Sequence, residues 1–291
     1  MKLIKYFFEF IIIIIFFLVF KIIGLKNSSN LGCYIFKKIG PLFRDQNKIR
    51  NNIKIAFKDI DDEKCKKIIK NMWCNYGRVF GEYMHLNILR NNRLNNVKII
   101  NADKLEEIRN IKKPIIFFSG HFSNFELLAM IIEKNNFNIS AIYRPLNNIF
   151  LNPIIKYLRI KYLCKEQIPK AIPGKSNGGT RMLLKKIKER KNIALMIDQK
   201  VSQGIMSELF GRKALTLNIP AQLMIKHGYI LVPLEIKREN SIEFKIKIKD
   251  PLKLDKIDDQ YSITKKLNEV LETMIKNNPD QWIWTHDRWR I

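Results

Sequence analysis

The clearest pattern along the chain is an apolar run followed by a polar turn and a helical repeat. Residues 115–119 read Ile-Ile-Phe-Phe-Ser, which is typical of a strand covered on both faces. Gly120 permits a turn after this run. Apolar residues then recur at helical spacing, at Leu127, Leu128, Ile131 and Ile132. The pattern predicts a strand, a turn that contains His121, and a helix, and turns of this kind are where α/β folds place their chemistry.

Other apolar runs predict a mainly parallel sheet flanked by helices. Short buried strands are expected at residues 140–143, 193–197 and 231–236. Residues 242–248 alternate between apolar and charged side chains, which predicts a half-exposed, antiparallel strand. Helices are expected to start at Asp61 or Asp62, at Gly178 and at Ile219, and an amphipathic helix runs from Ile263 to Ile275. The tryptophans at 282, 284 and 289 suit a membrane interface as well as a core.

The first 25 residues predict a membrane anchor whose apolar run is shorter than the hydrocarbon thickness of a bilayer. Residues 6–20 are apolar except for Glu9, and Lys5 and Lys21 flank them. On a helix these lysines stand about 24 Å apart, short of the roughly 30 Å of bilayer hydrocarbon, although terminal lysines can snorkel to the headgroups. A single span and an interfacial anchor are both open. No small-x-small cleavage site follows, so we expect an uncleaved anchor at residues 1–25 and one domain at residues 26–291.

The segment after the anchor is expected to begin as a linker. Residues 26–40 read as a polar linker and a short apolar stretch. The basic residues that follow the apolar run are Lys21, Lys26, Lys37, Lys38 and Arg44, and their excess favours a domain on the cytoplasmic side of an inner membrane.

Net charge indicates which classes of partner the protein can attract, and the cysteine pattern indicates the redox state of its compartment. The formal net charge of +26 implies attraction to nucleic acid, an acidic protein or a membrane surface, although biased residue usage accounts for part of it. The cysteines at 33, 65, 74 and 164 show neither zinc spacing nor a disulfide framework, so reduced thiols are expected. The four histidines have no ligand spacing, and no metal or cofactor is expected.

His121 and Glu126 form the candidate catalytic pair. On a continuous helix, residues five apart are rotated by about 140° from each other, so the two side chains cannot share a helix face. If His121 lies in the turn and Ser123 caps the helix, Glu126 can approach one imidazole nitrogen and leave the other available as a base. Ser123-x-x-Glu126 is also a capping box, in which the glutamate only satisfies backbone donors. These residues alone leave both interpretations open.

The His-x₄-Glu motif after a buried strand resembles that of the lipid A biosynthesis lauroyl and myristoyl acyltransferases. Further blocks are similar to that family in the same order: Tyr143 to Asn148, Asp198-Gln199, Leu209-Phe210-Gly211 with Ala214 and Thr216, and Pro279 to His286 with Arg288-Trp289. The resemblance covers nearly the whole chain, and an ordered set is far more specific than one motif. This chain departs from the family at Lys58, where the family has proline, and at Asp287, where it has a basic residue. The second departure leaves the role of His286 open.

The resemblance implies an acyltransferase with a glycerolipid-acyltransferase-like fold. An acyl carrier protein would donate a fatty acid to a 3-hydroxyacyl chain of a Kdo-bearing lipid A precursor, with His121 as base and Glu126 as its partner. Arg144 and Arg159 would handle anionic groups, Asp198 would organise the site, and Gly120 would let backbone amides face the oxyanion. Without the family, Arg144 reads as a surface arginine and Asp198 as a cap.

Two alternatives come from other readings of the same residues. Another membrane acyltransferase could act on a glycerol-phosphate, ornithine-lipid or mannoside acceptor, although glycerol-phosphate enzymes generally show Asp at the position of Glu126. A membrane-tethered nucleic-acid binder is supported by charge alone, so nucleic acid is not an expected partner.

Overall fold

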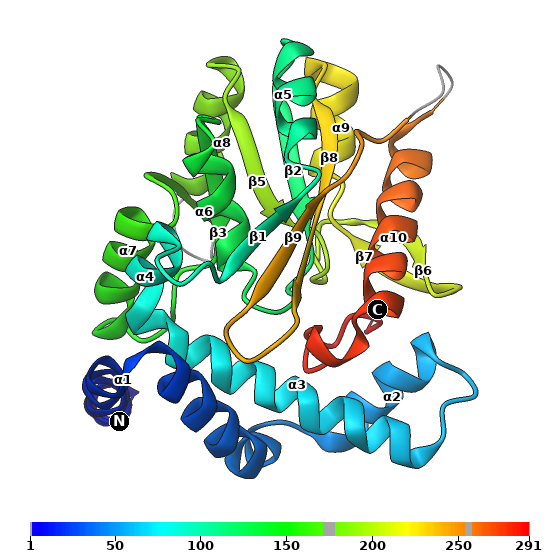
Figure 1. The fold of residues 1–291 in the computed structure, drawn as a ribbon. Helices are drawn as coiled ribbons and strands as arrows, with labels where there is room; N and C mark the ends of the chain where they lie inside the picture. Colours follow the sequence, from blue (N-terminus) through cyan, green and yellow to red (C-terminus); the bar gives the residue numbers. More distant parts are fainter. Residues whose placement is uncertain (1, 171–177, 254–257, 291) are drawn as a thin grey trace.

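The protein is an α/β domain built on a seven-stranded, mainly parallel sheet, as the sequence predicts. The computed structural model describes residues 2–170, 178–253 and 258–290. The sheet order is β1-β9-β8-β2-β5-β3-β4, and helices flank it (Figure 1). The strands are β1 (Val97–Ile100), β2 (Ile115–Ser119), β3 (Ile139–Tyr143), β4 (Glu166–Pro169), β5 (Asn192–Met196), β8 (Ile230–Arg238) and β9 (Phe244–Ile248), and β6 (Ile205–Leu209) pairs with β7 (Arg212–Thr216) in a separate hairpin.

The helices alternate with the strands through most of the chain. They are α1 (Lys2–Ile39), α2 (Gln46–Ala56), α3 (Asp62–Glu82), α4 (Leu86–Asn91), α5 (Asp103–Asn110), α6 (Glu126–Lys134), α7 (Leu151–Tyr162), α8 (Gly178–Lys188), α9 (Ile219–His227) and α10 (Gln260–Asn277), with 3₁₀ turns η1 (Gly40–Phe43), η2 (Tyr83–His85) and η3 (Pro279–Gln281).

The burial of the strands follows their residue patterns. All five residues of β2 are buried, as an apolar run with neighbours on both sides requires, because β2 lies between β5 and β8. In β9, buried and exposed residues alternate, and it pairs antiparallel with β8, as predicted. Trp282 and Trp284 are fully buried with their rings in contact, so the core accounts for them rather than a membrane interface.

Residues 26–39 are helical, so the expectation of a linker at residues 26–40 is wrong. Gly24, with φ 79°, kinks α1, and the helix then continues to Ile39. Figure 1 shows this second half of α1 beside α3, below the sheet. The two helices cross closely at Gly32 and Gly77, where a Cβ on either residue would overlap the carbonyl oxygen of the other. Tertiary packing on α3 therefore stabilises a helix that the local sequence does not announce.

A disulfide ties the same two helices, which corrects the expectation of reduced thiols throughout. Cys33 of α1 and Cys74 of α3 are bonded, with their Cα atoms 4.0 Å apart. Cys65 and Cys164 remain free and buried.

The helix crossing gives a test of the α1–α3 packing. We expect Gly77→Ala to destabilise the protein by roughly 1–3 kcal/mol, because the added methyl overpacks a contact that has no room for it. Gly178→Ala, at the exposed start of α8, should leave the melting temperature unchanged or slightly higher. Thermal denaturation of both variants in detergent measures this. A melting temperature of Gly77→Ala equal to that of Gly178→Ala would contradict the close crossing.

Candidate active site

Four neighbouring strands bring polar side chains to one edge of the sheet. In the order β2-β5-β3-β4, His121, Asp198, Arg144 and Lys170 follow the carboxyl ends of the strands. The register pairs Ser119 with Met196, so His121 and Asp198 each lie two residues beyond a matched pair. Strand pairing alone thus brings together two residues that are 77 positions apart.

His121 is held by the carboxylate of Asp198. The imidazole Nδ1 donates to Asp198 Oδ1 at 2.7 Å, and the His121 backbone N–H donates to Asp198 Oδ2 at 2.6 Å. The Phe125 ring lies edge-on to the imidazole, with centroids 4.6 Å apart. The side chain of His121 keeps 19% of its surface exposed, and its Nε2 has no hydrogen-bond partner among residues 2–170, 178–253 and 258–290. One nitrogen is therefore oriented and the other is available.

Asp198 is fully buried and remains ionised because donors surround it. The indole Nε1 of Trp282 supplies a third hydrogen bond, to Oδ2, at 2.9 Å. Burial by itself raises the pKa of this carboxyl, but the positive charge and hydrogen bonds of His121 and the bond from Trp282 outweigh it, so the pKa lies below its usual value. An anionic Asp198 can stabilise an imidazolium at His121.

Gly120 is required by the tight fit beside this pair. A Cβ at residue 120 would lie 2.7 Å from the Phe122 ring, 2.9 Å from Leu271 and 3.1 Å from Asp198 Oδ2. The backbone amides that follow are already engaged, since His121 donates to Asp198, Phe122 to the Gly120 carbonyl and Ser123 to the Gln281 carbonyl. Gly120 thus lets Asp198 approach, and these three amides already have acceptors within the protein.

The turn after His121 rests on a buried ion pair. Ser123 has a positive φ of 49°, and its carbonyl accepts a hydrogen bond from the Asn75 side chain of α3. The Asn124 side chain donates to Glu82, whose carboxylate receives both terminal nitrogens of Arg238. Helix α6 begins at Glu126, and its N-cap Phe125 makes no side-chain cap bond, so the predicted Ser123 cap is not formed.

Glu126 lies in a second ion pair and not on the imidazole. Its Oε1 accepts from Tyr83 Oη at 2.7 Å, from Arg159 Nη2 at 2.5 Å and from Arg159 Nε at 3.0 Å. In the described part of the chain the carboxylate that holds His121 is Asp198, so the structure shows neither the expected Glu126–His121 contact nor a capping box. Glu126 instead fixes the guanidinium of Arg159 on α7.

Electrostatics bind the Glu126 cluster tightly. Burial raises the pKa of Tyr83 well above its usual value, and the charge of Glu126 adds to this, so Tyr83 is a neutral donor. Burial alone would lower the pKa of Arg159, but Glu126 and Tyr83 reverse this and raise it. The Arg159 guanidinium also lies 5.5 Å from the centre of the Tyr143 ring, at the end of β3.

Arg144 and Lys170 flank the pair on the remaining strand ends. Arg144 is exposed, whereas Lys170 is half-buried, and the Lys170 backbone N–H donates to the Tyr143 carbonyl at 2.6 Å. Burial lowers the pKa of Lys170, the charge of Arg144 lowers it further, and Asp198 acts in the opposite direction. The two cations therefore share one small region beside the His121–Asp198 pair.

His286 has a structural partner. Its Nε2 accepts the backbone N–H of Lys200 at 2.8 Å, which makes it a neutral imidazole, and burial lowers its pKa. Arg288 is fully buried and donates to Leu215 and Thr216 of the hairpin. Both residues hold the carboxyl-terminal segment, His286 against the loop after β5 and Arg288 against β7.

Sequence reasoning missed Tyr83, Lys170 and Trp282 as site residues. Trp282 lies inside the block from Pro279 to His286 that resembles the family. Tyr83 lies among apolar residues at helical spacing, a pattern that normally indicates the core face of a helix. Lys170 carries no local signal, because its position depends on the pairing of β3 with β4.

Comparison with known proteins shows the family of the chain. No curated protein matches the chain in a sequence search. A scan against protein families, in contrast, matches all of residues 1–291 to the family described as bacterial lipid A biosynthesis acyltransferase. The ordered strand-end residues and the full-length match lead to one assignment: the chain belongs to the bacterial lipid A biosynthesis acyltransferase family.

Proposed function

We propose that the protein transfers a fatty acyl chain from an acyl-acyl carrier protein to the hydroxyl of a 3-hydroxyacyl chain on a Kdo-bearing lipid A precursor. Family membership makes it an acyltransferase of lipid A biosynthesis. The observation that carries the catalytic proposal is the His121–Asp198 pair, with Nδ1 held at 2.7 Å and Nε2 open. This is the arrangement that a general base needs.

The reaction needs one proton shuttle. His121 Nε2 would take the proton of the acceptor hydroxyl as its oxygen attacks the thioester carbonyl, and Asp198 would stabilise the imidazolium. Collapse of the tetrahedral intermediate would form the ester, and the departing thiolate would take the proton back from His121. An acyl-enzyme is not required, because the free thiols Cys65 and Cys164 are buried and burial raises the pKa of both.

The positive groups around the pair suit anionic substrates. Arg159 Nη1 has no hydrogen-bond partner in the described residues, while Nε and Nη2 are held by Glu126 and Tyr83. We assign Arg159 to a substrate anion with Glu126 as its positioning residue. Arg144 and Lys170 lie at the same edge, and we assign them to the phosphate groups of the donor or the acceptor.

The location proposed for this reaction is the cytoplasmic face of an inner membrane. The supporting observations are the apolar first helix, long enough to cross a membrane, and the basic residues that follow it.

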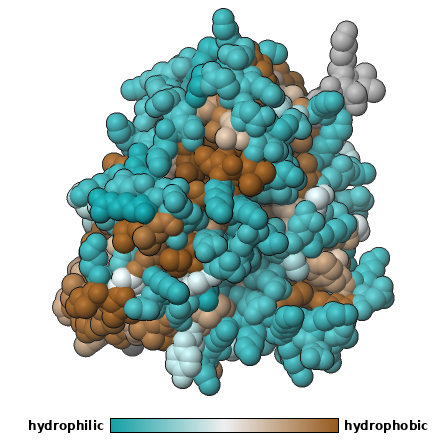
Figure 2. Space-filling model, in the orientation of Figure 1, coloured by the Kyte–Doolittle hydropathy of each residue, from teal (hydrophilic) through white to brown (hydrophobic). Residues whose placement is uncertain are grey.

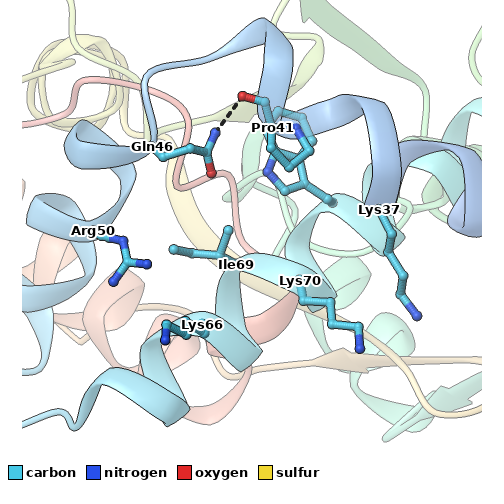
Figure 3. A pocket seen from close by; sticks show the side chains of 8 residues that line it. Lys37, Pro41, Gln46, Arg50, Lys66, Ile69 and Lys70 are labelled. Carbon is cyan, nitrogen blue, oxygen red and sulfur yellow. Dashed lines mark hydrogen bonds between the residues drawn. The ribbon is translucent and has the colours of Figure 1, made fainter.

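We assign a basic pocket as the binding surface for an acidic donor protein. It has a volume of about 180 Å³ and is lined by Lys37, Pro41, Gln46, Arg50, Lys66, Ile69, Lys70 and Trp73, with no acid among them. Figure 3 shows the side chains of Lys37, Arg50, Lys66 and Lys70 around Ile69. Arg50 pairs with the exposed Asp62 at 3.8 Å, so most of the positive charge there is not neutralised. Such a patch accelerates encounter with an anionic partner.

The Asp198→Asn variant tests the base. Asparagine can still accept from Trp282 and the His121 backbone, but its amide nitrogen cannot accept from Nδ1. We expect kcat/KM to fall on the order of 10²–10⁴-fold, close to His121→Ala, with a thermal midpoint near that of the parent. Asp280→Asn is the matched control, because Asp280 accepts from Asn71 outside the pair. An Asp198→Asn enzyme with parental turnover would remove Asp198 from the mechanism.

Double-variant kinetics test the role of Glu126. We expect Glu126→Gln and Arg159→Gln each to lose most activity, because the first frees the guanidinium and the second removes it. Residues that act as a unit are not additive, so the double variant should be about as active as the worse single variant. Glu126→Gln combined with Asp198→Asn should lose more than either alone if any activity stays measurable. If the fold-loss of the Glu126→Gln/Arg159→Gln double variant equals the product of the two single losses, this assignment is contradicted.

Salt dependence tests the donor. We expect kcat/KM with acyl-acyl carrier protein to fall as salt rises, because salt screens the attraction. The variant Lys37→Gln/Lys66→Gln/Lys70→Gln should lose roughly tenfold at low salt and respond less to added salt. The control Lys113→Gln/Lys226→Gln/Lys265→Gln removes the same charge from exposed positions elsewhere. Equal use of acyl-coenzyme A, or an equal effect of both triples, would refute this donor surface.

A further inference from the structure

The first half of α1 is fastened to the catalytic domain near its beginning. The buried Asn148, in the loop after β3, donates from its side chain to the Tyr6 carbonyl at 2.8 Å and to Glu9 Oε2 at 3.3 Å. The Phe150 ring contacts Phe7 and Phe10, with centroids 5.8 and 5.9 Å apart. This contact explains the single acid within the apolar run, since the Glu9 carboxylate meets an amide of the domain.

The same helix is fastened again near the kink. The rings of Phe16, Phe17 and Phe20 surround Phe80 of α3, and the nearest pair has centroids 5.3 Å apart. His85 Nε2 lies 2.9 Å from the Phe20 carbonyl, and Lys21 Nζ donates to the Met84 carbonyl at 3.5 Å. From Tyr6 to Lys21 the contacts extend over about 22 Å of helix. The helix thus lies lengthwise on the domain.

The outer side of this helix is a continuous apolar stripe. Its exposed apolar residues recur every three or four positions, as one helix face does: Leu3, Ile4, Phe7, Phe8, Ile11, Ile12, Ile15, Leu18, Val19 and Ile22. Leu146, Ile149 and Phe150 of the loop after β3 are exposed as well, and the Phe150 ring contacts Phe7 and Phe10 of the helix. Hydrophobic residues gather at the lower left of Figure 2, over the place where Figure 1 draws this helix end-on.

These contacts conflict with a helix that crosses the bilayer. The hydrocarbon is roughly 30 Å thick, so a crossing helix would carry the Asn148 loop past the midplane. That loop begins at the exposed Arg144 and has irregular backbone, and neither is tolerated in contact with lipid tails. A helix that lies along the interface places the loop at headgroup depth instead, with Lys2, Lys5 and Lys21 available to lipid phosphates.

We propose that residues 2–23 lie in the plane of the membrane, in one leaflet, and that Leu146, Ile149 and Phe150 insert beside them as part of the same lipid-binding surface. The occupant of this surface is the acyl-chain region of a lipid leaflet. Because Arg144 begins the inserted loop and also flanks the His121 edge, the surface holds the rim of the site at the membrane. The placement itself does not depend on the acyl-transfer chemistry.

Accessibility of single cysteine reporters tests this placement in the full chain. Lys2→Cys, Lys21→Cys and the domain control Lys226→Cys would be treated with a membrane-impermeant maleimide in sealed vesicles of both orientations, with the parent chain as the blank for its native cysteines. We expect all three reporters to react from the same side. Reaction of Lys2→Cys from the side opposite to Lys226→Cys means that the helix crosses the bilayer, and it overturns the proposal.

Depth measurements test the loop and exclude a protein partner. Environment-sensitive dyes on Ile11→Cys and Ile149→Cys should both be quenched by lipids that carry a quencher near the headgroup, and much less by lipids that carry it at the chain end. Quenching of Ile11→Cys alone removes the loop from the surface. Reporters that are shielded without lipid quenching, in a protein with dimeric mass in detergent, show that a second copy covers the stripe. Neither readout uses activity, so a failed acyl-transfer assay and a failed membrane placement remain distinct results.

Discussion

The buried carboxylate of Asp198 is the constraint on which the rest of the site depends. A fully buried charge is costly unless several donors compensate it, and here the donors come from segments far apart in the sequence. The β2–α6 turn provides the ring and backbone N–H of His121, and the carboxyl-terminal segment provides the Trp282 indole. Gly120 is needed because any side chain there would crowd the same oxygen. The orientation of His121 therefore follows from the need to compensate the buried charge of Asp198.

Two further buried carboxylates hold the turn from either side. Glu82 binds Arg238 and Asn124, while Glu126 binds Arg159 and Tyr83. Buried ion pairs add little net stability compared with apolar packing, but loss of one partner leaves an uncompensated charge. Their effect in this fold is geometric, because Asn124 and Glu126 fix the backbone that carries His121. Arg238 lies on β8, which neighbours β2, and Arg159 lies on α7, so two separate elements help to fix the position of one imidazole.

The sequence predicts the strands and helices around the site well, and it predicts poorly which side chains contact one another there. Strand β2, the helix after it and the polar residues at the strand ends follow from local periodicity, which depends on each segment alone. The choice between Glu126 and Asp198 as the partner of His121 does not, because it depends on β5 pairing beside β2. Proximity in the sequence favours Glu126, five residues away, as the partner of His121. The pairing of β2 with β5 places Asp198 beside the imidazole instead. The helix at residues 26–39 was likewise invisible locally, because the Gly32–Gly77 crossing that stabilises it lies between two segments.

The kink at Gly24 imposes a requirement of handedness on the chain. Its φ of 79° lies in the region that L residues rarely adopt, yet nothing lies within 4 Å of the position where a Cβ would be. An added Cβ would therefore meet no neighbouring atom, and the restriction at residue 24 is on the backbone conformation. The backbone angles at residue 24 are ones that an L-alanine resists. The angle between the first half of α1 and the domain thus depends on a residue that has no side chain.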